Sequence, residues 1–89
     1  MKIEKVISAV EPEKTYSLTE IAKKKLIPYA KSYPTAYRIV LEDLALPEEE
    51  RTLKAQILGD GKARTIRIKG EDLITYLRKN SKKVEAVKL

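Results

Sequence analysis

The segment from Leu53 to Lys69 has the pattern of a short basic β-hairpin, which constrains the fold more than any other feature. Apolar residues occupy alternate positions in both halves: Leu53, Ala55 and Ile57 in the first, Ile66 and Ile68 in the second. Period-two alternation places them on one face of a strand pair and the polar residues on the other. Between the halves, Asp60-Gly61 suits the positive φ of a tight turn. We therefore expect a protruding ribbon that carries Lys62 and Arg64 near its tip, a shape suited to a polyanion.

Composition narrows the remaining choices. A chain of 89 residues makes one small domain, which we place at residues 1–89 with its core in 16–80. The absence of cysteine excludes a disulfide framework and a thiolate metal site, and the absence of histidine removes the commonest acid/base group at neutral pH. Glu48, Glu49 and Glu50 are adjacent and so point in different directions, unlike paired catalytic carboxylates. We expect no enzyme activity, no cofactor, no metal and no small-molecule ligand.

Hydropathy argues against a membrane protein. No apolar run approaches the roughly 20 residues that a membrane-spanning helix needs. The first residues, Met1-Lys2-Ile3-Glu4, lack the long apolar core of a signal peptide. The sequence predicts a cytoplasmic protein, and its heavy use of Lys, Glu and Ile is typical of heat-adapted proteins.

Charge is unevenly distributed along the chain. The formal net charge is +6, and cations dominate from Arg51 to Lys69, whereas an acidic block precedes them: Glu42, Asp43, Glu48, Glu49 and Glu50. A basic surface of this kind is typical of proteins that bind nucleic acid. The molecule is expected to be electrically two-sided.

The first well-marked helix opens at Ser17-Leu18-Thr19-Glu20, a capping-box pattern. Pro28 should stop the helix beyond Leu26-Ile27. Lys23, Lys24 and Lys25 lie near its C-terminal end, where cations suit the helix dipole. These lysines are either a solvated helix end or contacts to DNA phosphates beside a recognition helix.

A second helix is predicted from Pro34 to about Leu44, with Ser32 as its cap. Ala36, Ile39 and Val40 form the inward stripe, which leaves Thr35 and Arg38 on an exposed face near the helix start. In a helix-turn-helix protein that part enters the major groove, where Arg reads guanine and Thr meets a thymine methyl or a phosphate. The alternative is an ordinary amphipathic helix with Tyr33 and Tyr37 at the edge of the core.

A third helix is predicted over residues 70–80, acidic at its start and basic at its end. Leu73, Ile74 and Leu77 should pack under the apolar face of the hairpin, with Tyr76 at the edge.

The segments at the two ends of the chain each allow two interpretations. Residues 3–10, in an N-terminal extension covering 1–15, form either a helix or a strand and could mediate dimerisation. Residues 81–89 form either a frayed basic tail or an added strand or dimer contact.

The order helix, turn, helix, basic hairpin, helix resembles the excisionase-like, MerR-related winged helix-turn-helix domains. The resemblance spans Tyr16 to Asn80 and rests on three blocks: Leu18-Thr19-Glu20-Ile21-Ala22, Ser32-Tyr33-Pro34-Thr35-Ala36-Tyr37-Arg38-Ile39, and Arg64-Thr65-Ile66-Arg67-Ile68-Lys69-Gly70-Glu71-Asp72-Leu73. It implies a small α+β fold, a winged helix-turn-helix with three helices and a β-hairpin wing. Such domains place the second helix in the major groove and the wing on the adjacent minor groove or backbone.

The resemblance implies that Thr35, Tyr37 and Arg38 contact the major groove and that Lys62 and Arg64 act on the wing. The full set of candidate DNA-contacting residues is Lys23, Lys24, Lys25, Lys31, Ser32, Tyr33, Thr35, Tyr37, Arg38, Lys62, Arg64 and Arg67. The expected function is sequence-specific binding of double-stranded DNA, without catalysis, by a transcriptional regulator or a recombination accessory factor, as a dimer or cooperative oligomer. The alternative is a protein-interaction module that binds an acidic partner.

One segment departs from the family pattern. Residues 42–52 replace a short glycine-containing turn with a longer acidic stretch that could form a helical turn from Pro47. If these carboxylates lie on the DNA-binding side of the protein, they would repel phosphate. If they lie on the opposite side, they would increase the charge asymmetry that orients the protein toward DNA.

Overall fold

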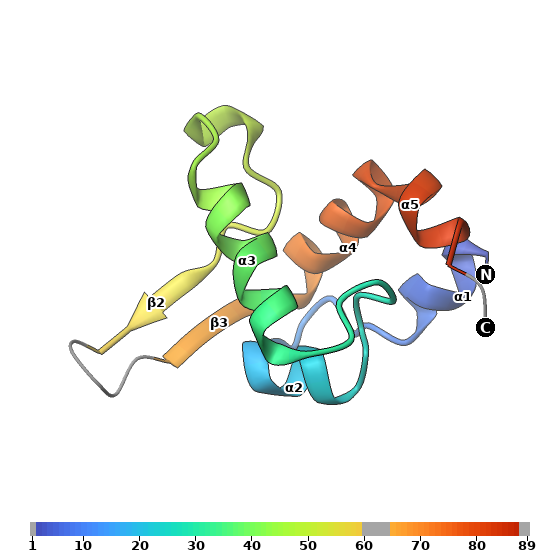
Figure 1. Cartoon of the computed structure of the whole chain (residues 1–89), viewed down its shortest axis with the longest axis horizontal. Coiled ribbons are helices and arrows are strands. Elements are labelled where there is room, and N and C mark those ends of the chain that lie inside the picture. Colours follow the sequence, from blue (N-terminus) through green and yellow to red (C-terminus); the bar gives the residue numbers. More distant parts are fainter. Residues whose placement is uncertain (1, 60–64, 88–89) are drawn as a thin grey trace.

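The computed structural model describes residues 2–59 and 65–87 and contains a three-stranded antiparallel sheet, part of which projects to one side of the helices (Figure 1). The elements in chain order are α1 (Ile3–Ser8), β1 (Thr15–Ser17), α2 (Leu18–Lys23), α3 (Tyr33–Leu44), the 3-10 turn η1 (Glu48–Glu50), β2 (Gln56–Leu58), β3 (Thr65–Lys69), α4 (Gly70–Lys79) and α5 (Ser81–Glu85). The expected α+β class is confirmed, with five α-helices among the described residues.

The hairpin strand β3 lies in the middle of the sheet, between β1 and β2. Tyr16 of β1 pairs with Ile68, and Ile57 of β2 pairs with Ile66. Sequence analysis did not predict β1, because three residues are too few to show a period. The strand nevertheless matters, since it leads directly into α2 and so attaches that helix to the sheet.

One hydrophobic core joins the sheet to the helices. Its largest fully buried side chains come from α2, α3, β3, α4, α5 and the connecting segments: Leu18, Ile21, Ile27, Val40, Leu53, Ile68, Leu73, Leu77 and Val84. The predicted inward stripes are confirmed at Ala36 and Val40 of α3 and at Leu73 and Leu77 of α4, while Ile39 and Ile74 are half-buried.

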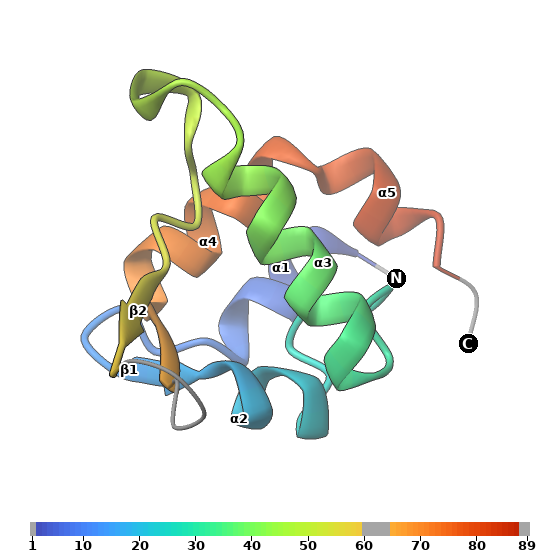
Figure 2. The same ribbon diagram turned by 60° about the vertical axis from the view of Figure 1, so that its left-hand side comes forward.

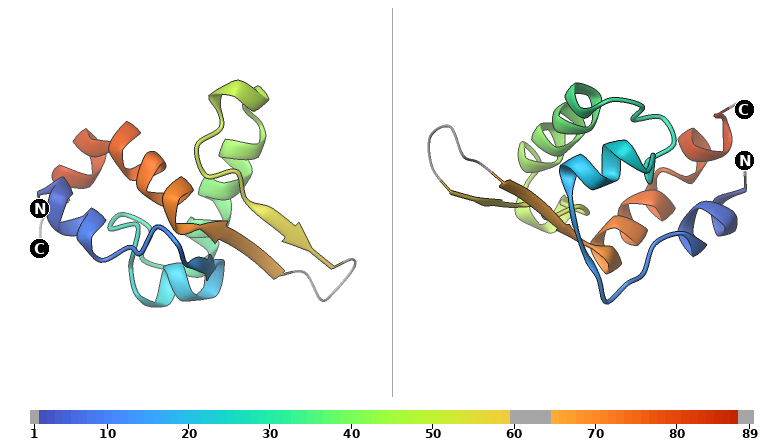
Figure 3. Two further views of the ribbon diagram at one scale, coloured as in Figure 1. Left: turned by 180° about the vertical axis from the view of Figure 1, so that it is seen from behind. Right: turned by 90° about the horizontal axis from the view of Figure 1, so that it is seen from below.

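Both flanking segments belong to this core. Residues 3–8 form a helix, α1, and Val6 and Val10 are buried. Residues 81–85 form α5 with Val84 fully buried, so the frayed-tail and added-strand interpretations of 81–89 are both wrong there. Helices α1 and α5 contact each other and both contact α4, on the side of the molecule away from the hairpin (Figures 1 and 3). The predicted core boundary at 16–80 was therefore too narrow.

The start of α4 is anchored by the loop that precedes β1. The Gly70 N–H donates to the Lys14 carbonyl at 2.7 Å, and the Glu71 N–H donates to the Pro12 carbonyl at 3.2 Å. A Cβ at position 70 would lie 2.0 Å from the Glu11 carbonyl oxygen. Only glycine fits this close approach, which gives a physical reason for the Lys69-Gly70-Glu71 sequence at the end of the hairpin.

The first arm of the predicted hairpin is shorter than expected. Strand β2 begins at Gln56, because a positive φ of 46° at Lys54 breaks the extended backbone. The Asp43 carboxylate holds this bend by accepting backbone N–H bonds from Thr52, Leu53 and Lys54 at 2.9 to 3.3 Å. Leu53 is buried as predicted, whereas Ile57 is 41% exposed, so the apolar face of the first arm is only partly covered. The predicted turn at Asp60-Gly61 lies outside the described residues.

Candidate nucleic-acid interface

Helices α2 and α3 pack against each other at the base of the hairpin (Figures 1 and 2). The predicted cap at the start of α2 is confirmed, since the Ser17 hydroxyl accepts the Glu20 N–H at 3.1 Å. The reciprocal half of the capping box is wrong: the Glu20 carboxylate instead bonds Lys24 at 2.8 Å and Lys14 at 3.2 Å. Its hydrogen bond to Lys24 is the first cause of a lowered Glu20 pKa.

Helix α2 ends at Lys23, before the predicted Leu26-Ile27. Lys25 adopts a φ of 53°, its N–H donates to the Ala22 carbonyl, and the Leu26 N–H donates to the Ile21 carbonyl. This pair of bonds is a Schellman cap, usually built on glycine. Sequence analysis missed it because lysine occupies the left-handed position, and so Pro28, which is buried in the following loop, does not set the helix end.

The lysines around this helix end are exposed. Lys24 is engaged with Glu20, and this hydrogen bond is the main cause of a raised Lys24 pKa. Lys23, Lys25 and Lys31 are solvent-exposed, and Lys31 immediately precedes the cap position of α3. The structure thus provides exposed cations at the end of α2 and at the start of α3.

The N-terminal half of α3 presents polar side chains in pairs. The Ser32 and Thr35 hydroxyls lie 3.1 Å apart in a mutual hydrogen bond, so Ser32 does not cap the helix with its side chain as predicted. The rings of Tyr33 and Tyr37 contact each other at an interplanar angle of 50° with centroids 6.2 Å apart, Tyr33 exposed and Tyr37 half-buried.

Arg38 is the cation of the exposed ridge of α3. Its Nε lies 3.9 Å from the Glu42 carboxylate, and both side chains are 72% exposed. A pair so exposed contributes little and is easily broken, so the guanidinium can reach a ligand. Leu41, which is 46% exposed, lies on the same ridge and is an additional surface residue to which sequence analysis gave no role.

The acidic segment lies at the opposite end of α3. The twelve residues of this helix correspond to about 18 Å of length. The turn η1, predicted from Pro47, holds Glu48, Glu49 and Glu50 beyond the C-terminal end (Figure 1). Glu48, Glu49 and Glu50 are therefore separated from Ser32 by the length of the helix, whereas Glu42 lies on α3 one turn from Arg38.

Of the predicted DNA-contacting residues on the hairpin, Arg67 lies within the described residues. Arg67 is exposed on β3, opposite Ser17 and Gln56, and alternates with the buried Ile66 and Ile68. Since successive side chains of a strand point to opposite faces, Arg67 lies on the outer face of the sheet, away from the core. Lys62 and Arg64 lie outside the described residues.

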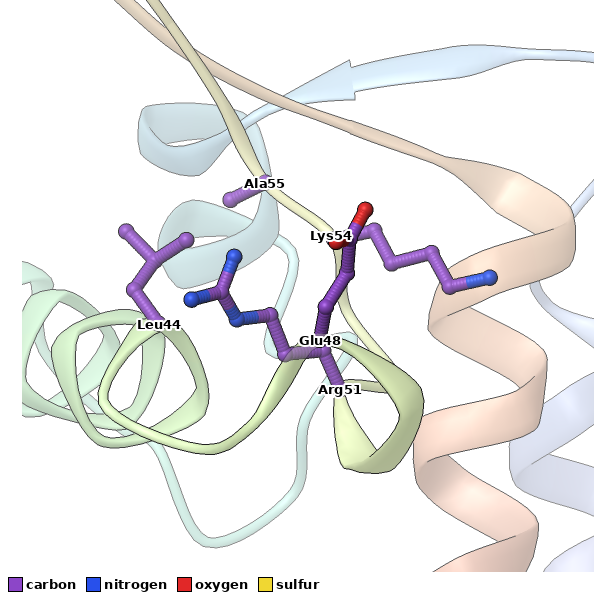
Figure 4. A pocket seen from close by; sticks show the side chains of 5 residues that line it. All are labelled: Leu44, Glu48, Arg51, Lys54 and Ala55. Atoms are coloured by element: carbon purple, nitrogen blue, oxygen red, sulfur yellow. The ribbon is translucent and has the colours of Figure 1, made fainter.

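A hollow of 270 Å³ opens between the end of α3, η1 and the segment before β2 (Figure 4). It is lined by Leu44, Glu48, Arg51, Lys54 and Ala55. The Arg51 Nε donates to the Leu46 carbonyl at 2.9 Å, which holds the side chain against the wall.

Two further results concern the classes of function considered from sequence. No cluster of three or more acidic residues that could hold a metal ion occurs within residues 2–59 and 65–87. Within the same ranges, no helix is long and apolar enough to span a bilayer.

No protein-family model, curated protein or solved structure matches this chain.

Proposed function

We propose that the chain is a winged helix-turn-helix protein that binds double-stranded DNA sequence-specifically, with α3 as the recognition helix and the β2–β3 hairpin as the wing. The observation that carries the proposal is the order of the elements. Helix α2 packs on α3, the antiparallel hairpin follows, and α4 closes the core behind it (Figure 1). This is the order of the excisionase-like, MerR-related domains that the sequence resembles.

The distribution of charge along α3 supports the same proposal. The N-terminal part of the helix, with Ser32, Thr35 and Arg38, is polar and exposed or half-exposed, and Lys31 precedes it. Helix N-termini attract phosphate through their free N–H groups and their dipole. The carboxylates of η1 lie at the other end, so a duplex at the N-terminal end would meet cations before it met the acidic turn.

In this account the protein acts by binding alone, as a regulator of transcription or an accessory factor in recombination, in the cytoplasm where its DNA lies. Thr35 and Arg38 read base edges, whereas Lys23, Lys25 and Lys31 contact phosphates. Phosphate contacts position the protein and base contacts give it sequence preference.

The test distinguishes base-reading residues from phosphate-contacting residues. It uses a duplex that the wild-type protein has selected from a library. Arg38→Ala should relax the preference at one base position by about 1 to 3 kcal/mol. Lys31→Ala should weaken binding to all duplexes similarly and reduce the salt slope by about one. Arg78→Ala, at an exposed position on α4, removes the same kind of charge outside the interface and serves as the control.

Fluorescence anisotropy at several salt concentrations measures all three variants. Loss of base preference in Arg38→Ala alone supports the proposal. If Arg38→Ala and Arg78→Ala have the same small effect, α3 does not read DNA, and a basic surface that binds an acidic protein becomes the better explanation.

A further inference from the structure

Exposed cations gather at the junction of α4 and α5, outside the interface assigned above. Residues 73–84 contain no acidic residue. Their cations are Arg78, Lys79, Lys82 and Lys83, and all of them are exposed. Sequence analysis gave none of these residues a role in DNA binding. A stretch of positive charge without an acidic residue is suited to phosphate.

Two of these lysines are held on different sides of the molecule. The Lys79 Nζ donates to the Glu50 carbonyl at 3.3 Å, so its ammonium lies beside the acidic turn η1. The Lys83 Nζ instead lies over the Tyr29 ring, 6.0 Å from its centroid. The face of an aromatic ring attracts an ammonium at about this distance. Lys83 therefore points toward the loop between α2 and α3, and Lys79 toward the far end of α3.

Tyr29 connects the Lys83 ammonium to the start of α3. It belongs to the loop 24–32, which lies between α3 and α5 (Figures 1 and 3). Its hydroxyl forms a hydrogen bond with the Tyr76 hydroxyl, which fixes the loop to α4. Lys31 follows Tyr29 by two residues, so their Cα atoms are at most about 7 Å apart. The ammonium of Lys83 is thus held beside the loop that carries Lys31.

The tyrosine also lies near the side of α3 that carries Arg38. Burial is the main cause of the raised Tyr29 pKa, and the negative charge of Glu42 raises it further. Such an effect requires a nearby charge. The Glu42 carboxylate is in turn 3.9 Å from the Arg38 Nε. Neighbouring groups therefore connect Arg38, through Glu42 and Tyr29, to Lys83.

Helix α5 is a firm support for this lysine. Val84, the next residue, is fully buried, and α5 contacts both α1 and α4. We propose that α5 is a second phosphate-contacting element of the DNA interface, on the side of α3 away from the hairpin, and that Lys83 makes the contact. The proposal rests on the proposed function, since the phosphate belongs to the duplex that α3 reads. The contact adds affinity and orientation without base preference.

Matched lysine variants test the contact. Lys83→Gln should weaken binding to every duplex about fivefold at about 0.15 M salt and reduce the salt slope by about one, as expected for the loss of one phosphate contact. Lys79→Gln removes the same charge from α4 and should change neither quantity. Lys83→Arg keeps the charge and should bind like the wild-type chain. Anisotropy titrations at several salt concentrations measure these effects, and circular dichroism verifies that each variant folds.

DNA cleavage from a tethered iron–EDTA group locates the contact. The chain has no cysteine, so Lys83→Cys and Lys79→Cys each provide one attachment site. The tether at position 83 should cut the backbone at one site beside the base pair whose preference depends on Arg38. The tether at position 79 should give no such cut.

The outcomes separate this proposal from the proposed function. If Lys83→Gln and Lys79→Gln have equal salt slopes, or if both tethers cut the duplex alike, α5 does not contact phosphate. The role of α3 would still stand if Arg38→Ala loses its base preference. A wild-type chain that selects no duplex would overturn both proposals.

Discussion

Gly70 is a position at which a side chain would clash with neighbouring backbone. Its N–H bonds the Lys14 carbonyl, and the Glu11 carbonyl oxygen occupies the space that a Cβ would need. Gly70→Ala should lower the free energy of unfolding by about 3 kcal/mol, because backbone rather than a flexible side chain must move. Urea denaturation measures this. Arg78→Ala on the same helix should change stability by no more than about 0.5 kcal/mol, and an equally small effect of Gly70→Ala would contradict the observed packing.

Asp43 is a buried carboxylate, 4% exposed, whose oxygens act as hydrogen-bond acceptors for backbone N–H groups. It accepts three successive N–H groups and the Thr52 hydroxyl. Asp43→Ala should lower the free energy of unfolding by about 3 kcal/mol, since three part-buried or buried backbone N–H groups would lose their acceptor.

The matched variant Asp43→Asn keeps one acceptor oxygen and should cost less than Asp43→Ala. Hydrogen exchange provides the local measurement, because protection of the Thr52, Leu53 and Lys54 amides should fall first. Unchanged protection in Asp43→Ala would show that the bend forms without the carboxylate.

The hydroxyls of Tyr29 and Tyr76 form a hydrogen bond that joins the loop after α2 to α4. Burial is the main cause that raises the pKa of Tyr76, and it also raises the pKa of Tyr29. A folded-state pKa above the unfolded value contributes stability that is present below about pH 10 and is lost as pH rises further. The free energy of unfolding should therefore fall above about pH 10.

Replacement of both tyrosines by phenylalanine isolates this effect from lysine titration. The double variant Tyr29→Phe/Tyr76→Phe should show a shallower loss of stability between about pH 10 and 12 than the wild-type chain. Thermal unfolding over that range measures the slope. Parallel slopes in the two proteins would exclude the pair as the source of alkaline destabilisation.

At the scale of elements, a substitution at the end of α2 should change stability and DNA binding in opposite directions. Lys25 holds a left-handed φ that glycine adopts without strain. Lys25→Gly should therefore raise the free energy of unfolding by about 0.5 to 1 kcal/mol. The same variant should weaken DNA binding if Lys25 contacts phosphate. Chemical denaturation and anisotropy on one preparation measure both, and a loss of stability would contradict the cap geometry.

The elements with clear local signals were predicted well. Ser17 with Glu20 marked the start of α2, Pro34 marked the start of α3, and the run from Gly70 to Lys79 had both helical period and dipole charges. The acidic turn η1 was anticipated from Pro47. These are effects of neighbouring residues, which a sequence displays directly.

Features that depend on distant residues were not predicted. The short β2 results from a bend that Asp43 stabilises from α3, 11 residues before Lys54. Residues 81–85 form a helix because Val84 finds a place in the core beside α1, which periodicity alone cannot show. For the candidate interface, the exposure of Arg38 followed from the period of α3, whereas Thr35 is only half-exposed. The position of Arg67 on the outer face of the sheet required the register of β3.

At the scale of the whole molecule, the fold separates surfaces of different character. The acidic turn lies at one end of α3 and the polar, lysine-flanked surface at the other, while the hairpin projects to one side (Figures 1 and 2). Such an arrangement gives a basic protein a preferred orientation near a polyanion. One small module buries roughly 600 to 1,000 Å² on DNA, so pairing of two copies would extend the site.

The most direct test of DNA reading is selection of duplexes from a random library at near-physiological salt, followed by anisotropy titration of the enriched sequence and its scramble. The account predicts an enriched motif that binds at least about a thousandfold more tightly than the scramble, with affinity falling steeply as salt rises. Weak binding without an enriched motif would contradict it, because a basic surface alone binds every duplex alike.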